Sequence, residues 1–478
     1  MAQAHVVVIG GGIAGLTAAA LLGGATGEGA RARVTLLEAS ERLGGKLWGG
    51  EVGGVRVDLG AESMLARRPE AVELARAVGL AAQLEPPTTA KAAIWTRGAL
   101  RPLPGGQVMG VPGDLAALAD SGVLSPEGLA RARQETAGEP VADDVAIGRY
   151  VADRLGREVV DRLVEPLLGG VYAGHADEIS LRAAVPALLP VARGGGSLLA
   201  GVHGLATRPG TAGTPVFQGL RGGLGTLPAA VAAACERAGV ELRTGTGVTG
   251  LRRTPEGWRV TAADGGVLAA DAVVLAVPAP AAARLLRADV PAAAGELDAV
   301  EYAGMALVTL AFRRADLPVP PAGSGFLVPP VDGRRIKAST FSSNKWGWLE
   351  RSAPDSFLLR TSLGRLHEEE PLELDDGELV ARSLADLGEA IGLTARPYDT
   401  AVTRWRAGLP QYPVGHLDRV ARIRAAADRA GALALCGAAY DGVGIPACVA
   451  SARAAVAGLE RVLTPPTGAN VTERTMGA

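Results

Sequence analysis

The sequence predicts an α/β protein in which a discontinuous Rossmann-like domain is interrupted by a mixed α+β domain and by a helical subdomain. Two observations lead to this prediction. The chain opens with HVVVIGGGIAGLTAAALLGG, where a β-branched run leads through glycines into alanines and leucines. Much later come a strand pattern at 272–277 and a strand, glycine loop and long helix within 431–463. We expect the strand at 272–277 to rejoin the sheet that residues 5–9 begin.

The opening stretch fits a dinucleotide-binding unit. Gly10, Gly12 and Gly15 form G-x-G-x-x-G between a buried strand at 5–9 and a helix at 13–22. The first glycine permits the tight turn, the second lets the backbone approach a pyrophosphate, and the third lets helix and strand pack closely. The helix N-terminus offers free N–H groups to the phosphates.

A second strand follows at the expected distance. Val34–Leu37 is apolar and ends at Glu38, 23 residues after Gly15. An acid at this spacing accepts hydrogen bonds from a ribose diol. A glycine turn between a strand and a helix is common without any ligand, but the flanking strands and the acid together favour dinucleotide binding.

Composition sets limits on the function. The 478 residues provide for two or three domains, and 48 basic against 50 acidic residues argue against a nucleic-acid partner. Three dispersed cysteines, Cys235, Cys436 and Cys448, indicate a reducing, cytoplasmic compartment and no metal site. We find neither a signal peptide nor an apolar run long enough to span a membrane, which leaves a peripheral contact with the inner face of the membrane open.

The segment after Glu38 distinguishes FAD from NAD. It reads ERLGGKLWGGEVGGVRVDLGAES and places Gly44 and Gly45 shortly after the acid. The ordered series VIGGGIAGL, LLEA, RLGG and DLGAES resembles the superfamily of amine oxidases, phytoene desaturases and protoporphyrinogen oxidases. In such flavoproteins this segment makes a second glycine-rich contact to FAD, so the resemblance implies an FAD-binding domain.

Five further fragments narrow the resemblance. EPLLGGVYAG, GGLGTLP, IKASTFSSNKW, RWRAGLPQYPVGH and YDGVGIPACVASARAA together are similar to the protoporphyrinogen oxidase family. They look most like its bacterial oxygen-dependent members that act on coproporphyrinogen III. The resemblance covers about residues 5–460. The resemblance implies removal of six electrons from coproporphyrinogen III to give coproporphyrin III in heme biosynthesis, with three O2 reduced to three H2O2.

The resemblance assigns FAD contacts position by position. The pyrophosphate would meet the glycine loop, the adenosine would meet Glu38, Ala39 and the backbone of Val248, and the flavin would meet Trp405, although that indole also fits an ordinary core position. Relatives often place Arg or Trp where this chain has Lys46. The complete expected set is Gly10, Gly11, Gly12, Ile13, Ala14, Gly15, Glu38, Ala39, Gly45, Lys46, Gly60, Ala61, Glu62, Ser63, Val248, Trp405, Val443, Gly444 and Ile445.

Three further residues are candidates for contact with the substrate, and each also fits a purely structural position. Lys91 and Arg97 are candidates for binding substrate carboxylates, and a solvated basic loop explains them equally well. Tyr172 is a substrate candidate or a core residue. The surroundings of Cys436 do not match the attachment motif of covalent flavoproteins, so FAD is expected to be noncovalent. No histidine or carboxylate set indicates a catalytic acid or base, and none is assigned.

The expected domains follow from these motifs. Residues 1–85, 215–285 and 400–464 form the FAD-binding domain, 86–214 a helical subdomain facing substrate or membrane, and 286–399 a substrate-binding sheet domain. Residues 465–478 form a flexible tail.

Several alternatives remain open. Protoporphyrinogen IX oxidase is the nearest, a flavin amine oxidase is more distant, and a non-enzymatic binding protein with the FAD fold differs in class. The Ala-, Gly- and Arg-rich composition suggests a high-GC bacterium, where the family usually uses coproporphyrinogen. The expected partners are porphyrinogen, O2 and, transiently, a downstream heme-pathway enzyme that receives the product.

Overall fold

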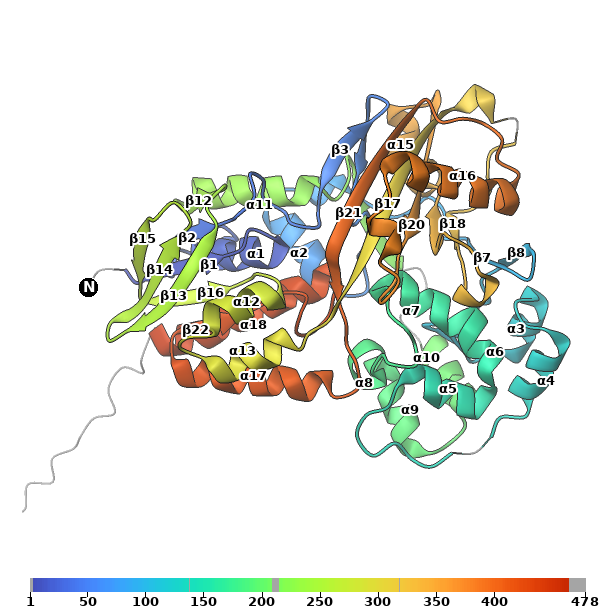
Figure 1. The fold of residues 1–478 in the computed structure, drawn as a ribbon, viewed down its shortest axis with the longest axis horizontal. Coiled ribbons are helices and arrows are strands. Elements are labelled where there is room, and N and C mark those ends of the chain that lie inside the picture. Colours follow the sequence, from blue (N-terminus) through green and yellow to red (C-terminus); the bar gives the residue numbers. More distant parts are fainter. Residues whose placement is uncertain (1–2, 137, 209–214, 318, 464–478) are drawn as a thin grey trace, which may run out of the picture.

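A five-stranded parallel sheet forms the core of the first lobe, at the left of Figure 1. The computed structural model describes residues 3–136, 138–208, 215–317 and 319–463; the expected tail at 465–478 lies outside them. The strands run in the order β12 (Glu241–Arg243), β2 (Arg33–Leu37), β1 (His5–Ile9), β16 (Ala272–Leu275) and β22 (Leu433–Leu435). Val6 pairs with Ala272, so the later strand rejoins the first, as predicted.

Helices cover one face of this sheet and a meander with helices covers the other. The first layer contains α1 (Ile13–Leu22), α11 (Thr226–Arg237) and α18 (Ile445–Leu463). In α1 every residue except Leu21 is buried, which explains why this helix is apolar on all sides. The opposite layer contains β13 (Val248–Thr254), β14 (Gly257–Ala262), β15 (Val267–Ala270), α12 (Ala279–Leu286), α13 (Pro291–Asp298) and α17 (His416–Ala430).

A seven-stranded sheet forms the second lobe, at the upper right of Figure 1. Its order is β21 (Asp399–Pro410), β17 (Tyr302–Arg313), β20 (Ser356–Leu363), β19 (Ala338–Thr340), β18 (Gly325–Leu327), β7 (Ala92–Thr96) and β8 (Ala99–Pro102). Side chains alternate along β17: Val308 and Leu310 pack with α16 (Asp376–Ile391), whereas Leu307 points into a cavity. One face of the sheet is therefore core and the other lines the cavity.

The third lobe, at the lower right of Figure 1, is helical. A continuous helical run joins α6 (Arg157–Val159), a π turn (Val160–Val164) and α7 (Glu165–Tyr172). Its core is an aliphatic cluster that also contains Tyr150, Tyr172 and Tyr412. The other helices are α3 (Leu115–Ser121), α4 (Pro126–Arg133), α5 (Ile147–Leu155), α8 (Leu181–Ala184), α9 (Leu189–Gly194) and α10 (Leu198–Ala206).

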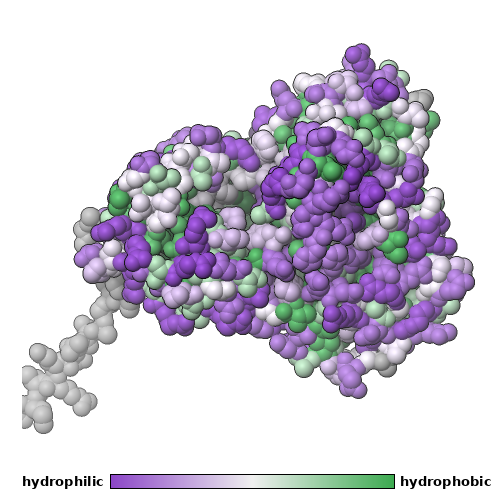
Figure 2. Space-filling model, viewed as in Figure 1, coloured by the Kyte–Doolittle hydropathy of each residue, from purple (hydrophilic) through white to green (hydrophobic). Residues whose placement is uncertain are grey.

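Short elements connect the lobes. β3 (Gly49–Val52) and β4 (Val55–Asp58) form a hairpin against the seven-stranded sheet, and α2 (Glu70–Ala77) packs on α18. The small sheets contain β5 (Met64–Leu65), β6 (Leu84–Glu85), β9 (Gln107–Val108), β10 (Val111–Pro112) and β11 (Phe217–Leu220). Hydrophilic residues cover much of the face drawn in Figure 2. Within the described ranges, no helix combines the length and apolarity that a membrane crossing needs.

Three expected domain boundaries differ from the structure. The hairpin β7–β8 lies within the expected helical range 86–214 but extends the seven-stranded sheet through its pairing with β18. β21 lies within the expected 400–464 piece but pairs with β17 in the second lobe. α13 lies within the expected 286–399 domain but packs on the parallel sheet with α12 and α17. Hydrogen-bond pairing and packing, rather than position in the chain, decide each case.

Candidate functional site

The loop between β1 and α1 has the shape of a phosphate cradle. Gly10 has φ +108°, a left-handed value that favours glycine. A Cβ on Gly15 would lie 1.8 Å from the carbonyl oxygen of Gly10, so strand and helix pack without room for a side chain. Among the residues that the structure describes, a Cβ on Gly12 would have no heavy atom within 4 Å, and no side chain caps the first N–H groups of α1. The loop therefore leaves free space in front of uncapped N–H donors, as pyrophosphate binding requires.

Glu38 lies against this loop. Its Oε2 accepts a hydrogen bond from the N–H of Gly11 at 2.6 Å, and its Oε1 accepts from the N–H and hydroxyl of Ser40 at 2.9 and 2.8 Å. The contacts fix the carboxylate beside the glycine loop while leaving it half-buried. A carboxylate so oriented has remaining lone pairs for a ribose diol. Sequence reasoning missed Ser40, which orients Glu38.

The expected adenosine residues meet at the edge of the parallel sheet. The N–H of Thr246 donates to the carbonyl of Glu38 at 2.8 Å, and the N–H of Gly245 donates to that of Ser40 at 2.9 Å. A Cβ on Gly247 would lie 3.5 Å from the Cβ of Ala39. Val248 follows directly as the first residue of β13, so residues more than 200 positions apart form one end of the site.

The second glycine pair, Gly44 and Gly45, lies directly beside the phosphate cradle. The N–H of Gly44 donates to the carbonyl of Gly11 at 2.8 Å, and a Cβ on Gly45 would lie 3.3 Å from the Cα of Gly12. The carbonyl of Lys46 accepts from the N–H of Ala61 at 3.1 Å. The segments 10–15, 44–46 and 60–61, which we call the cofactor track, are therefore contiguous. There is free space in front of Gly12 at one end, and Lys46, Gly60 and Ala61 line a cavity at the other, which fits an extended dinucleotide such as FAD.

The start of α18 adjoins this track. Val443 packs against the helical lobe, and Ile445 is the first residue of the helix. Leu47, which follows Lys46, belongs to the same hydrophobic core as Ile445 and Cys448 in the first turn of α18, so the second glycine segment and the start of this helix share one core. Burial raises the pKa of Cys448 to about 11 and that of Cys436 to about 12, so both thiols are neutral at physiological pH. Both are consequently poor nucleophiles.

Glu62 sits in a buried ion cluster that joins two lobes. Its Oε1 accepts from Lys345 Nζ at 2.7 Å, and its Oε2 lies 3.3 Å from Arg360 Nε. Although burial raises it, the charges of Arg360 and Lys345 hold the pKa of Glu62 down at about 2. Lys345 Nζ also lies 3.5 Å from Ser63 Oγ. The cluster connects residues 60–63, which are among the expected FAD contacts, to the seven-stranded sheet.

Arg360 and Asp58 hold the neighbouring backbone. Arg360 donates to the carbonyl of Gly60 at 2.7 Å. Asp58 accepts from the N–H groups of Leu224 and Gly225, each at 2.8 Å, while burial raises its pKa to about 6. These contacts span 166 to 300 positions in sequence. Local motifs carry no signal for them, and sequence reasoning missed both residues.

A cavity of about 330 Å³ opens beside this cluster. It lies where the three lobes meet, with walls from the cofactor track, from α7 and from the seven-stranded sheet. The residues that line it are Lys46, Gly60, Ala61, Gly170, Val171, Met305, Leu307, Leu327, Lys337, Ala338, Thr340, Arg360, Thr361, Ser362, Trp405, Gly408 and Leu409. The walls are mostly aliphatic and small, with three cations among them. This composition suits a large apolar ligand that carries negative charges.

Trp405 belongs to the cavity wall rather than to a core. It pairs with Met305 across β21 and β17, and its ring lies 3.4 Å from the position of a Cβ on Gly60. Its indole contacts Trp48 edge to face, with centroids 6.1 Å apart. Trp405 therefore faces the point where the cofactor track enters the cavity.

The three substrate candidates from the sequence do not line this cavity. Lys91 is exposed. Arg97 lies in the β7–β8 turn, where its guanidinium donates to the carbonyls of Gly122 and Leu124. Tyr172 is buried in the helical core beside Tyr412, and burial raises its pKa to about 12. Among the described residues, no group of His, Cys, Asp and Glu could hold a metal ion.

The chain is similar to a known protein family and to named enzymes along nearly its whole length. The model of a family described as flavin containing amine oxidoreductase matches residues 13–459. The chain is 38% identical over 458 residues to coproporphyrinogen III oxidase of Mycobacterium leprae (95% of this chain, 97% of the relative). It is 32% identical over 462 residues to coproporphyrinogen III oxidase of Bacillus subtilis, with the same two coverages.

Two solved structures of other proteins have a similar fold. A protein from Exiguobacterium sp. 255-15, whose name proposes that it is a protoporphyrinogen oxidase, is 33% identical with a TM-score of 0.84, covering 96% of this chain and 99% of that one. Cyclohexylamine oxidase from Brevibacterium oxydans is 17% identical with a TM-score of 0.67, covering 97% and 100%. The second likeness supports the three-lobed fold alone.

Proposed function

Because the chain belongs to the family of flavin-containing amine oxidoreductases, we propose that it oxidises coproporphyrinogen III to coproporphyrin III with FAD and O2, as a step of heme biosynthesis. The observation that carries the proposal is identity of 38% to a named coproporphyrinogen III oxidase over 95% of the chain. The product then passes to a later enzyme of the same pathway.

The residues divide between cofactor and substrate. Gly10–Gly15 would bind the pyrophosphate, Glu38 the adenosine ribose, and the stretch from Lys46 to Ala61 the flavin end. Bound FAD supplies a two-electron acceptor that O2 restores after each cycle. Removing six electrons takes three such cycles and forms three H2O2. The protein's own task is to hold each bridging carbon of the macrocycle in turn at the flavin end of the cavity.

Charge explains how the cavity would recognise its substrate. Of the three cations that line it, Arg360 is paired with Glu62. Lys46 and Lys337 have no carboxylate partner within ion-pair distance among the described residues. A macrocycle with four propionates supplies such carboxylates, and the aliphatic walls provide a water-poor surface for its ring.

Porphyrin fluorescence tests this function. Holoenzyme in air should convert coproporphyrinogen III to fluorescent coproporphyrin III with about three H2O2 for each porphyrin, above the spontaneous rate measured without enzyme. Protoporphyrinogen IX, with two propionates, should react less efficiently. Added salt should weaken binding of the four-propionate substrate more, because screening acts on charge. Turnover of an amine with no acceleration of either porphyrinogen would refute the proposal.

Protoporphyrinogen IX oxidase is the second candidate. The name of the Exiguobacterium structure, which is 33% identical, favours it. A strong preference for protoporphyrinogen IX in the same assay would favour this second candidate. The identity of the substrate would then change, whereas the FAD- and O2-dependent oxidation of a porphyrinogen would stand.

A further inference from the structure

Lysine is scarce in this chain and concentrated at the cavity. Only four of its 48 basic residues are lysines, and two of those, Lys46 and Lys337, line the cavity. Lys337 is 5% exposed. Its N–H donates to the carbonyl of Ser362 at 2.8 Å, and its carbonyl accepts from the N–H of Val328 at 2.9 Å. The backbone on both sides is therefore fixed by neighbouring strands, which determines where the side chain begins.

The ammonium of Lys337 lacks a strong acceptor among the described residues. Its one side-chain hydrogen bond reaches the sulfur of Met305 at 4.0 Å, and a thioether is a weak acceptor. Lys345, the other lysine of this lobe with little exposure, has the carboxylate of Glu62 at 2.7 Å. Burying an ammonium without an acceptor is unfavourable. Lys337 is thus an unsatisfied cation at the wall of a cavity.

A cluster of charged side chains lies next to Lys337. The guanidinium of Arg365 donates to the carbonyl of Val328 at 3.1 Å, and the N–H of Val328 donates to the carbonyl of Lys337. Behind it, Arg365 Nη1 lies 3.6 Å from Glu368, and His175 Nδ1 lies 3.4 Å from Glu165. Hydrogen bonding to Glu165 raises the pKa of His175 to about 9 despite its burial, so this histidine is charged at neutral pH. With Lys337, three basic side chains therefore face two carboxylates. Burial, and next the charge of Arg365, lower the pKa of Lys337 to about 7, so its positive charge is only about half present at pH 7 until a carboxylate binds beside it.

We propose that Lys337 binds one propionate carboxylate of the porphyrinogen and so helps to select the substrate, an inference that rests on the proposed function. The carboxylate would supply the negative charge that the cluster lacks. It would also accept hydrogen bonds from an ammonium whose one hydrogen-bond acceptor within the described ranges is the sulfur of Met305. Because the cluster joins α7 to the seven-stranded sheet, a bound propionate is held where the helical lobe meets the sheet.

Equilibrium binding of the product tests this role without turnover. The FAD-loaded variant Lys337→Met keeps the length of the side chain and removes its charge. We expect it to bind coproporphyrin III about 10- to 100-fold more weakly than wild type, as is typical for the loss of a charge-assisted hydrogen bond. Its affinity for the tetramethyl ester of coproporphyrin III, which carries no carboxylate, should change less than about twofold. Fluorescence titration measures both.

A matched variant controls for the loss of charge in general. Arg313 is exposed at the far end of β17, and Arg313→Met removes one positive charge from the same sheet. It should leave both affinities unchanged. Lys337→Gln, which retains a hydrogen-bond donor, is measured beside Lys337→Met. FAD content and the melting temperature establish that each variant is folded.

The outcomes separate the alternatives. Equal affinity of wild type and Lys337→Met for coproporphyrin III, or an equal loss for acid and ester, would overturn the carboxylate role. A fall in kcat with unchanged product affinity would also overturn it and would instead make Lys337 a proton acceptor. If wild type binds coproporphyrin III but oxidises neither porphyrinogen, the proposed function is wrong while the comparison of acid with ester still decides the role of Lys337.

Discussion

Two glycines of the phosphate loop serve different purposes. A Cβ on Gly15 would collide with the carbonyl of Gly10 at 1.8 Å, so this glycine is required by the fold. A Cβ on Gly12 would meet no atom within 4 Å, so the protein itself does not require a glycine there. What requires it is the ligand that approaches the uncapped start of α1.

The variant Gly12→Val should separate cofactor binding from folding. The branched side chain occupies the expected pyrophosphate position, and a steric cost of only about 1.4 kcal/mol weakens binding tenfold. We expect purified Gly12→Val to retain less than about one tenth of the wild-type FAD, by absorbance per protein. Its apoprotein should melt close to wild-type apoprotein, whereas Gly15→Val should be destabilised even without FAD. Normal FAD content in Gly12→Val would refute the pyrophosphate assignment.

Glu38 should contribute affinity through its charge. Glu38→Gln keeps the shape of the side chain but weakens charge-assisted hydrogen bonds worth about 1.5–3 kcal/mol, so the Kd for FAD should rise about 10- to 100-fold. Titration of apoprotein with FAD measures this. Glu41→Gln neutralises an exposed carboxylate three residues away and should leave the Kd unchanged. Equal affinities for Glu38→Gln and wild type would exclude the ribose role.

Sequence can indicate a role for a residue where the chemistry is local. The phosphate loop and Glu38 lie within one strand–helix–strand unit, so their spacing alone indicates their role. Arg360 and Lys337 act through contacts with segments that are remote in sequence, such as Gly60 for Arg360. No short motif encodes those contacts, and only the assembled sheet shows them.

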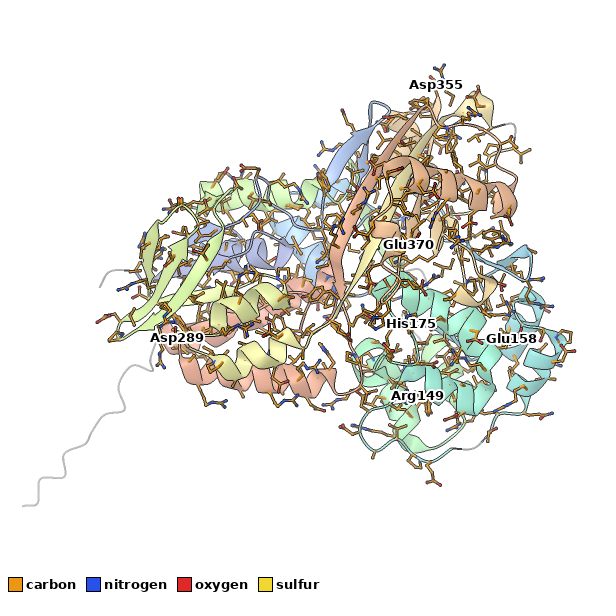
Figure 3. The ribbon with its side chains drawn as sticks, in the orientation of Figure 1. Arg149, Glu158, His175, Asp289, Asp355 and Glu370 are labelled. Carbon is orange, nitrogen blue, oxygen red and sulfur yellow. The ribbon has the colours of Figure 1, made fainter. Side chains whose placement is uncertain are left out.

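His175 connects the helical lobe to the seven-stranded sheet. It follows α7, its Nδ1 lies 3.4 Å from Glu165, and its Nε2 lies 3.0 Å from the carbonyl of Leu366. Figure 3 shows His175 at this junction, below Glu370 of the sheet lobe. A charged imidazole at this point stabilises the docking of α7, which forms one wall of the cavity.

This contact predicts a pH-dependent stability. The folded pKa of His175, about 9, exceeds its unfolded value of 6.5, so its stabilisation is fully present below pH 6.5 and is lost as the pH rises through 9. We expect wild type to melt about 1–3 °C above His175→Gln at pH 6 and to lose this advantage by about pH 10. The difference in melting temperature between the two proteins removes the contribution of titratable groups that both contain, including Lys337. A difference that stays constant from pH 6 to pH 10 would show that His175 is not charged.

The β7–β8 hairpin shows why one element was missed. Its two turn residues, Arg97 and Gly98, both have positive φ, at 52° and 72°. Tight hairpins favour this geometry, but Asn-Gly or Asp-Gly signals it in a sequence, whereas Arg-Gly does not. The surrounding proline and glycine content instead indicates loops. Pairing of β7 with β18, more than 200 positions away, makes these residues a strand.

The candidate site forms only when segments that are far apart in the sequence come together in the folded protein. The parallel sheet combines strands from residues 5–37, 241–275 and 433–435, and its reassembly was predictable from hydrophobic patterns. The cavity was not predictable, because Gly60, Gly170, Leu327 and Trp405 come from different lobes. Its position beside the cofactor track connects the flavin chemistry of the family with a large anionic substrate.

Anaerobic mixing of the yellow holoenzyme with coproporphyrinogen III observes electron transfer from substrate to flavin without oxygen. We expect coproporphyrinogen III to bleach the flavin absorbance, protoporphyrinogen IX to bleach it more slowly and a panel of amines not to bleach it, and we expect the colour to recover with H2O2 formation when air is admitted. Flavin that stays oxidised with both porphyrinogens but bleaches with an amine would contradict the proposed function.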